Sequence, residues 1–233
     1  MGDALMAIVQ DGTAQSSSND VSGASIFTEV TVSTSGTDRR LYALIAAGGA
    51  GGAQDSQTTA VTGGGLTWTV IREARWWERT AAIWVAAAPA QLTSAVIRAT
   101  VTSSINTINC VSLTVVALSG ASSTPGVENY LISDGTEPIV TLAGTTAGSW
   151  ALVAGCNYQT GSALTPNGST TAYVNRNALT AYALITGRLT GTSPGGSISI
   201  GGGSAGGTGS AAVAVEILAE MITGISTIGW GML

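Results

Sequence analysis

Short stretches of this chain alternate apolar and polar residues, and this alternation restricts the fold more than any other feature of the sequence. Ile97, Ala99 and Val101 alternate with arginine and threonine, and the run Ala211–Leu218 repeats the pattern with valine and isoleucine. A period of two residues is typical of a half-buried strand, whereas an amphipathic helix needs a period of 3.6. Turn residues separate nearly all of these stretches, so the sequence predicts roughly ten to twelve strands and an all-β fold.

Evenly spaced short strands joined by turns are typical of an antiparallel β-sandwich, and we expect one of jelly-roll type. The sandwich is predicted to span residues 26–218, because that range holds no recognisable linker or internal repeat. Residues 1–25 are expected to form an N-terminal arm, with a short strand at Ala4–Gln10 and then a polar loop through AQSSSNDVSGAS. Residues 219–233 are expected to form an apolar C-terminal tail.

Charged residues make up only 9% of the chain, against roughly 25% in ordinary soluble domains. One explanation is a surface of serine, threonine and glycine. The other is that neighbouring subunits cover much of the surface, which predicts a homo-oligomer. Both remain open. The net charge of −5 argues against a nucleic-acid partner, and no apolar run reaches the ~18 residues of a membrane helix, so no membrane partner is expected.

The residue types on which many enzymes depend are missing from this chain. It has no histidine and no lysine, which excludes a Ser-His-Asp triad and a Ser-Lys pair. Cys110 and Cys156 are interpreted as buried core thiols, and whether they form a disulfide stays open. Neighbouring carboxylates are better explained by surface ion pairs and a turn than by glycoside hydrolysis. We therefore expect no catalytic residue, no cofactor, no metal ligand and no enzymatic activity.

The stretch Gly63–Ala88 carries four of the six tryptophans and predicts a long β-hairpin with a charged, aromatic tip. Adjacent tryptophans in a strand point to opposite faces, so at least one of the two at the tip is expected outside the core. Exposed tryptophan and arginine often anchor interfaces, and tryptophan also stacks on sugar rings. The candidate contact residues at the tip are Arg75, Trp76, Trp77 and Arg79. The alternative is that both tryptophans cover the open end of the sandwich.

The tail after Leu218 is the second candidate contact surface. Its apolar residues are too numerous for a solvated terminus, so the tail is expected either to pack against its own sandwich or to dock on another subunit. The candidate docking residues are Met221, Ile225, Ile228, Trp230 and Leu233.

Several stretches resemble β-sandwich domains of tailed-phage virion structural proteins and of some bacterial surface proteins. They are GGGLTWTVIREA, TAAIWVAAAP, AVIRATVTSS, VSLTVVALSGA, VTLAGTTAGSWALVAG and AAVAVEIL. The resemblance covers roughly residues 26–218 and is a pattern of strands and turns. It implies a structural or adhesive role and carries no functional residues.

The resemblance, the low charge and the apolar tail together lead to one principal hypothesis. The protein is expected to be a non-enzymatic capsid decoration (cement) protein that reinforces the shell by contacts between subunits. Its partners would then be other virion proteins, the capsid shell above all, and its location the virion, assembled in the host cytoplasm. The alternative is a tail-fibre or adhesin domain that binds a host-surface glycan.

Overall fold

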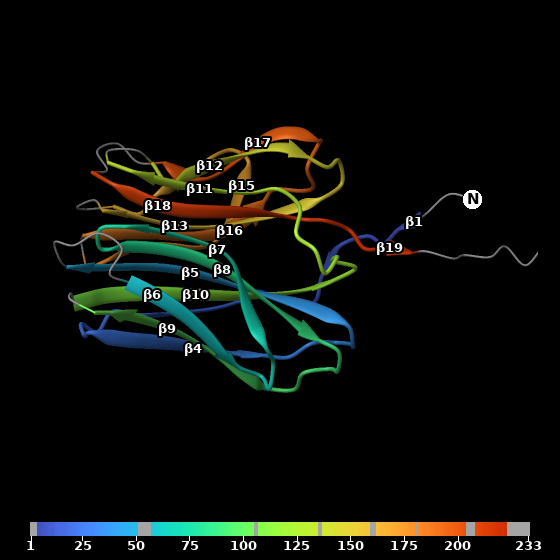
Figure 1. Ribbon diagram of the computed structural model, residues 1–233, viewed down its shortest axis with the longest axis horizontal. Helices are drawn as coiled ribbons and strands as arrows, with labels where there is room; N and C mark the ends of the chain where they lie inside the picture. Colours follow the sequence, from blue (N-terminus) through green and yellow to red (C-terminus); the bar gives the residue numbers. More distant parts are fainter. Residues whose placement is uncertain are drawn as a thin grey trace, which may run out of the picture.

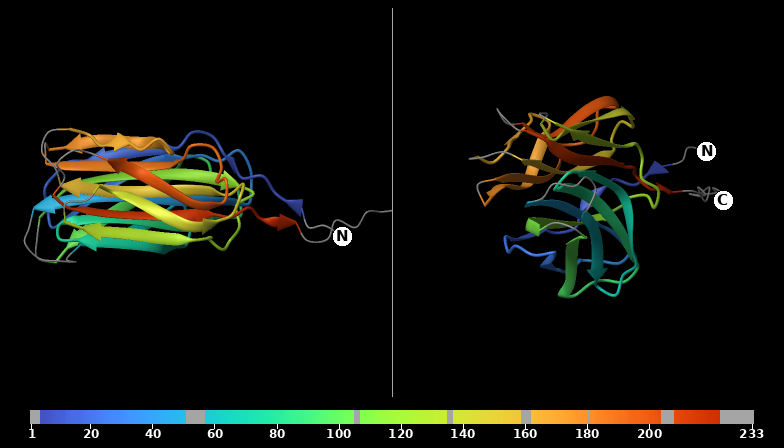
Figure 2. Two further views of the ribbon diagram at one scale, coloured as in Figure 1. Left: turned by 90° about the horizontal axis from the view of Figure 1, so that it is seen from above. Right: turned by 60° about the vertical axis from the view of Figure 1, so that its left-hand side comes forward.

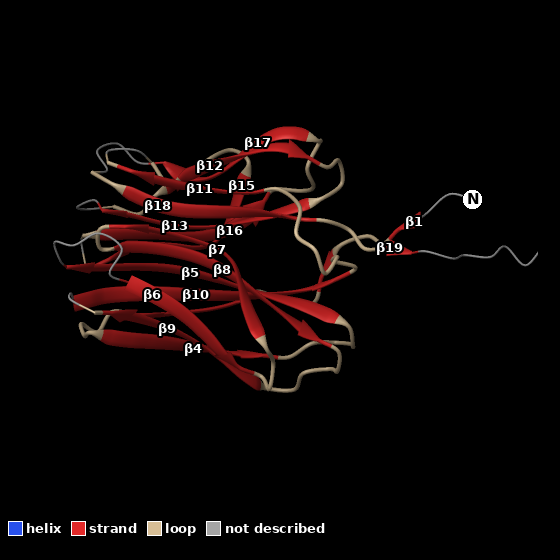
Figure 3. Cartoon of the chain, viewed as in Figure 1, coloured by secondary structure: helices blue, strands red, loops and turns tan. Residues whose placement is uncertain are grey.

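The structure, a computed structural model, describes residues 4–50, 57–104, 107–134, 137–158, 162–179, 181–203 and 208–222. These residues form strands, turns and loops without any helix, so the predicted all-β class is confirmed (Figure 3). Within the same ranges, no helical segment has the length and apolar character needed to cross a membrane.

The strands are numbered along the chain. The first half contributes β1 (Ala4–Leu5), β2 (Val9–Gln10), β3 (Gln15–Asn19), β4 (Ser25–Val32), β5 (Arg39–Ala50), β6 (Gln57–Gly63), β7 (Trp68–Trp76), β8 (Arg79–Ala88), β9 (Ala95–Ser103) and β10 (Thr107–Ser119). The second half contributes β11 (Glu128–Ser133), β12 (Ile139–Thr145), β13 (Trp150–Tyr158), β14 (Thr165–Pro166), β15 (Thr170–Ala178), β16 (Tyr182–Leu189), β17 (Gly196–Gly203), β18 (Ser210–Ile217) and β19 (Met221–Ile222).

These strands build two antiparallel sandwiches that stack into four layers (Figure 1). In the first sandwich, the larger sheet has the order β2-β10-β5-β8-β7, with β3 also paired to β10, and the smaller sheet has the order β4-β9-β6. In the second sandwich the larger sheet is β11-β18-β13-β16-β15 and the smaller is β12-β17-β14. The antiparallel sandwich is therefore confirmed, but residues 26–218 hold two sandwiches rather than one.

The second sandwich repeats the topology of the first, strand for strand. The order β3-β10-β5-β8-β7 returns as β11-β18-β13-β16-β15, and β4-β9-β6 returns as β12-β17-β14. Even a register irregularity is shared, between Val70 and Arg72 in β7 and between Ala172 and Val174 in β15. The sequence has no clean internal repeat, so the duplication is one of topology. The two halves share a pattern of buried positions, which many different apolar residues can satisfy.

Each sandwich also shows most of the nested pairing that defines a jelly roll. In the first sandwich, β3 pairs with β10, β4 with β9, and β5 with β8, so that outer pairs enclose inner ones. The remaining pair of that scheme would join β6 to β7. Instead, β7 pairs with β8 and extends the larger sheet. Three of the four nested pairs of a jelly roll are thus present.

The two larger sheets face each other and form what we call the central interface. Leu44, Ile83 and Val116 of the first sandwich pack there against Leu152 and Val213 of the second, and all five side chains are fully buried. A further apolar core fills the inside of the first sandwich, and another fills the inside of the second. Figure 2 shows the resulting body from two further directions. Because each larger sheet is buried on both faces, part of the low charge is explained within a single chain.

The predicted polar loop AQSSSNDVSGAS is partly a strand, because serine hydroxyls bond to buried hydroxyls of the neighbouring strand. In β3, Ser16 bonds to Thr114 at 2.9 Å and Ser18 to Ser112 at 2.7 Å. The chain of hydroxyls continues across the central interface, where Thr114 and Thr186 lie 2.7 Å apart. Residues of the predicted N-terminal arm therefore belong to the first sandwich.

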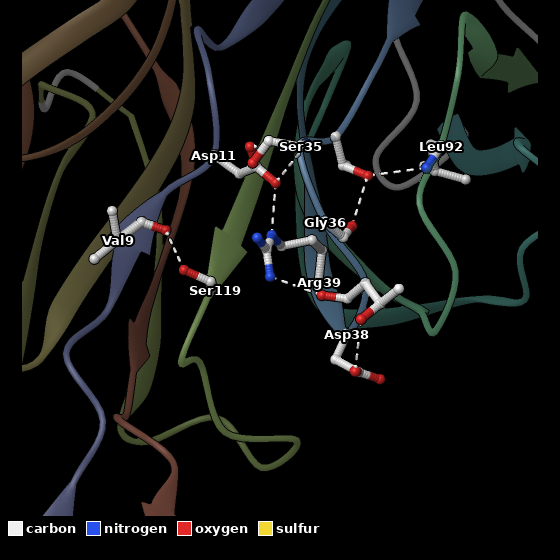
Figure 4. Close-up of polar contacts among 10 residues, drawn as sticks. Val9, Asp11, Ser35, Gly36, Asp38, Arg39, Leu92 and Ser119 are labelled. Atoms are coloured by element: carbon white, nitrogen blue, oxygen red, sulfur yellow. Dashed lines mark hydrogen bonds and ion pairs between the residues drawn. The ribbon is translucent and has the colours of Figure 1, made fainter.

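Asp11 fixes the segment before β3 to the turn between β4 and β5 (Figure 4). Its carboxylate accepts hydrogen bonds from the backbone N–H of Ser35 and from Arg39 Nε, the latter at 2.6 Å. Burial alone would raise the pKa of Asp11. The hydrogen bonds from Ser35 and Arg39 outweigh it, so the pKa lies below its ordinary value.

Strand β7 contacts two different cores along its length. Leu66, Trp68 and Val70 alternate with Thr67 and Thr69, a pattern that by itself predicts all three on one core-facing side. Leu66 and Trp68 do pack against the core of the first sandwich, but Val70 is 41% exposed. The irregularity after Val70 shifts the alternation, so Ala74, at an even-numbered position like Trp68, packs against the central interface instead.

The Asp11 contacts make stability depend on pH in a predictable direction. Because the pKa is lower in the folded than in the unfolded chain, the stabilisation is complete above pH ~4 and is lost as pH falls through the folded pKa. We expect Asp11→Asn to lower the free energy of unfolding at pH 7 by about 1–3 kcal/mol. Denaturant unfolding between pH 2 and 7 would measure this, and the variant should lose less stability than wild type on acidification. An equal loss in both proteins would contradict the assignment.

Candidate functional site

The molecule has two different ends. The turn between β7 and β8 lies at one end, and β1 and β19 project from the other as a short antiparallel ribbon (Figure 1). We call this pair of strands the terminal ribbon. The two candidate contact surfaces predicted from the sequence, the hairpin tip and the start of the C-terminal tail, therefore lie at opposite ends of the molecule.

The predicted hairpin tip is confirmed as a two-residue turn. Trp76 and Arg79 are paired across the hairpin, which leaves Trp77 and Glu78 as the turn residues. Trp77 has a φ of 52°, a left-handed conformation that is uncommon for a large side chain. Trp76 and Trp77 are both half-buried, so neither is a freely exposed ring.

Arg79 does not lie on the surface as the contact hypothesis expected. It is only 5% exposed, and its guanidinium lies 3.4 Å from the Glu78 carboxylate and 5.1 Å from the centre of the Tyr158 ring. Tyr158 belongs to the second sandwich. Arg79 therefore closes one end of the central interface, and the contact it makes is within the chain.

Trp76 also connects the two sandwiches. Its ring packs against the central interface, and its Nε1–H donates a hydrogen bond of 2.9 Å to Asp134, just after β11. Arg75 pairs with Glu73, whose carboxylate also accepts hydrogen bonds from Thr59. Of the four tip residues, Trp76 and Arg79 thus have structural roles, whereas Arg75 and Trp77 remain partly accessible.

The terminal ribbon is the more exposed of the two surfaces. Leu5 pairs directly with Met221 across the ribbon, and the two side chains are 59% and 57% exposed. Next to them is a groove of about 390 Å³, lined by Leu5, Met6, Ala7, Ile8, Thr146, Ala147, Gly148, Ser149, Leu218, Ala219 and Met221. Of the five candidate docking residues in the tail, only Met221 is described. Ile225, Ile228, Trp230 and Leu233 lie outside the described residues.

A third surface, which the sequence did not indicate, runs between β7 and β11. Arg72 lies over the ring of Tyr130 at 4.3 Å and within 3.9 Å of the Glu128 carboxylate. Sequence reasoning missed it because β11 was not predicted as a strand. Its sequence ENYLIS shows little alternation of apolar and polar residues. All six residues are exposed or only partly buried, so none of them has to be apolar.

The cysteines are placed for packing rather than for chemistry. Cys110 and Cys156 are free thiols, and both are fully buried. Burial raises the pKa of Cys110 to about 12 and that of Cys156 well above its ordinary value. Since the thiolate is the nucleophilic form, neither sulfur is activated at neutral pH.

Glu216 is a buried carboxylate in β18. It is 1% exposed and accepts hydrogen bonds from Val127 N–H at 2.9 Å, Thr146 N–H at 2.5 Å and the Ser149 hydroxyl at 2.7 Å. Both carboxylate oxygens therefore accept from backbone N–H groups. Glu216 holds the start of β11 and the β12–β13 turn beside β18.

This geometry predicts that Glu216→Gln is destabilising although it preserves size. An amide has only one acceptor oxygen, so its NH₂ group would face a backbone N–H whichever way it is oriented. We expect the free energy of unfolding to fall by about 1–3 kcal/mol. Denaturant titration checks this, with Glu220→Gln, at an exposed position, as the matched control. Equal stability of the Glu216 variant and wild type would show that the two N–H bonds contribute nothing.

Comparison with protein-family models, with curated proteins and with solved structures found no match to this chain. Among the described residues, no group of three or more histidine, cysteine, aspartate or glutamate side chains could hold a metal ion. The candidate contact surfaces of the described residues are the terminal ribbon, the hairpin tip and the surface between β7 and β11.

Proposed function

We propose that the protein is a structural component of a phage virion, and specifically a decoration protein that attaches to the capsid shell through the terminal ribbon. The observation that carries this proposal is the exposed apolar pair Leu5 and Met221 on a ribbon that projects from a compact double sandwich. Contiguous exposed apolar surface of this kind is typical of sites that another protein covers.

The rest of the molecule supports a mechanical role. Backbone hydrogen bonds fix the base of the ribbon, because Met6 N–H donates to Glu220 O at 2.9 Å and Glu220 N–H to Gly120 O at 2.8 Å. Force applied at the ribbon would therefore pass into both sandwiches, since Gly120 follows β10 of the first sandwich and Glu220 follows β18 of the second. The central interface joins the sandwiches into one body. Such a protein reinforces a shell by burying surface across its subunits.

Two carboxylates that could have served in catalysis are engaged in this architecture. Glu216 holds backbone N–H groups, and Glu73 bonds to Thr59 and pairs with Arg75. We therefore propose a function in binding rather than in catalysis, without a cofactor. A homo-oligomer on the shell is part of the same proposal.

The attachment surface can be tested by replacing the apolar pair. We expect Leu5→Ser with Met221→Ser to reduce occupancy on purified particles at least tenfold, because the double change removes apolar contact area from the interface. The matched control is Val96→Ser, which alters a side chain of similar exposure, 48%, on the outer sheet. Thermal unfolding of all three proteins would show that the fold is retained.

Copy number decides which part of the virion the protein occupies. Quantitative mass spectrometry of wild-type particles should find hundreds of copies, as a shell-covering protein requires. Full occupancy by the double variant would contradict attachment through the ribbon. A few copies per particle would contradict the decoration role and favour the tail or neck.

A further inference from the structure

We propose that the surface between β7 and β11 binds a neutral carbohydrate chain. We call this surface the seam groove, because it follows the line where an edge strand of one sandwich faces an edge strand of the other. It consists of two adjoining hollows. One, of about 390 Å³, is lined by Arg72, Glu73, Ala74, Arg75, Tyr130 and Ile132, and the other, of about 520 Å³, includes Thr69, Val70, Ile71 and Glu128.

The side chains in the seam groove match the chemistry of a sugar ring. Tyr130 and Ile132 are 42% and 39% exposed, and Ile132 together with the part of the Tyr130 ring that Arg72 does not cover offers an apolar surface to the C–H face of a sugar. Arg72 and Glu128 lie beside them, with side chains 35% and 37% exposed. A guanidinium supplies planar donors and a carboxylate supplies acceptors, which together suit the hydroxyl groups of a hexose.

Most of the hydrogen-bonding groups of this pair are available to a ligand, but Arg72 Nε is buried and out of its reach. The closest approach of Arg72 to Glu128 is 3.9 Å, which is too long for a hydrogen bond. The outer face of the first sandwich carries a similar trio in which the same groups are engaged. There Arg98 lies over Phe27 at 4.2 Å and bonds tightly to Glu29 at 2.6 Å. The difference marks the seam groove as the surface with unused donors and acceptors.

The duplicated fold offers a second comparison. At the corresponding edge of the second sandwich, Tyr173 of β15 donates its hydroxyl to Gln10 at 3.1 Å, and Arg176 pairs with Asp20. There a tyrosine and an arginine close the seam with contacts inside the chain. At the β7 edge, Arg72 and Tyr130 stack on each other but leave the hollows beside them open.

The shape and charge of the groove favour a sugar chain over a peptide or a nucleic acid. The irregularity at Ile71 and the charged residues of β7 hinder the addition of another strand to this edge. Arg72 and Arg75 are offset by Glu73 and Glu128, so Arg40 of the second hollow leaves the groove with an excess of a single positive charge, far less than a nucleic acid requires. From Thr69 to Arg75 it extends about 20 Å at the rise of a strand, which is long enough for several sugar rings.

A glycan array of neutral and acidic oligosaccharides, followed by calorimetric titration of the hits, tests this proposal. We expect wild type to bind a neutral chain and both Tyr130→Ala and Glu128→Gln to weaken binding at least tenfold. Phe27→Ala, which alters the matched aromatic residue on the outer face, should leave affinity unchanged. All four proteins should show the same cooperative thermal unfolding.

The proposal does not depend on where the protein sits in the virion. A decoration protein and a tail-fibre or adhesin domain could both carry such a groove, so particle occupancy and glycan binding are separate readouts. No binding to any neutral glycan, or the same loss of affinity in Phe27→Ala as in Tyr130→Ala, would overturn it. Binding confined to acidic polymers or to peptides would overturn it as well.

Discussion

The central interface is the contact on which the rest of the structure depends. Each larger sheet would expose an apolar face if the other were absent, and the buried residues include Leu44, Ile83, Leu152 and Val213. Fully burying one such side chain contributes about 1.5–3 kcal/mol, so the interface outweighs any single polar contact of the chain. It also dictates the residue types of the larger sheets, which must be apolar on both faces.

The same interface explains why the polar contacts lie where they do. Arg79 with Tyr158, and Trp76 with Asp134, join the two sandwiches at the end that carries the hairpin tip. Near that end the Tyr182 hydroxyl bonds to the carbonyl of Gly49, and its ring lies so close to Gly48 that a Cβ there would overlap it. The edges of the stack are less constrained, and the seam groove and the terminal ribbon, our two candidate contact surfaces, both lie at the margins of this packing.

The sequence predicted the strands best where burial is one-sided. Alternation at Ile97, Ala99 and Val101 identified β9 correctly, since one face of that outer sheet meets solvent. It could not reveal the duplication, because corresponding strands share apolar positions rather than identical residues. The alternation also failed to predict the edge strands β3 and β11. Both are exposed or only partly buried, so they contain serine, asparagine and glutamate in place of alternating apolar residues.

The candidate site was predictable only in part, for a related reason. The aromatic hairpin tip was found because tryptophan and arginine are conspicuous in a chain with so little charge. Whether those side chains face solvent depends on what packs against them, and Arg79 is covered by the second sandwich. Arg72, Glu128 and Tyr130 come together only because two distant strands become facing edges of the stack. A pattern within a short stretch of sequence cannot predict a contact between two strands that are far apart in the chain.

Native-state hydrogen exchange tests most directly whether the central interface makes the two sandwiches one cooperative unit. We expect the slowest amides of β5 and those of β13 to exchange with the same free energy, because neither larger sheet can lose its partner and remain folded. A second sandwich whose amides exchange at a clearly lower free energy than those of the first would contradict this account.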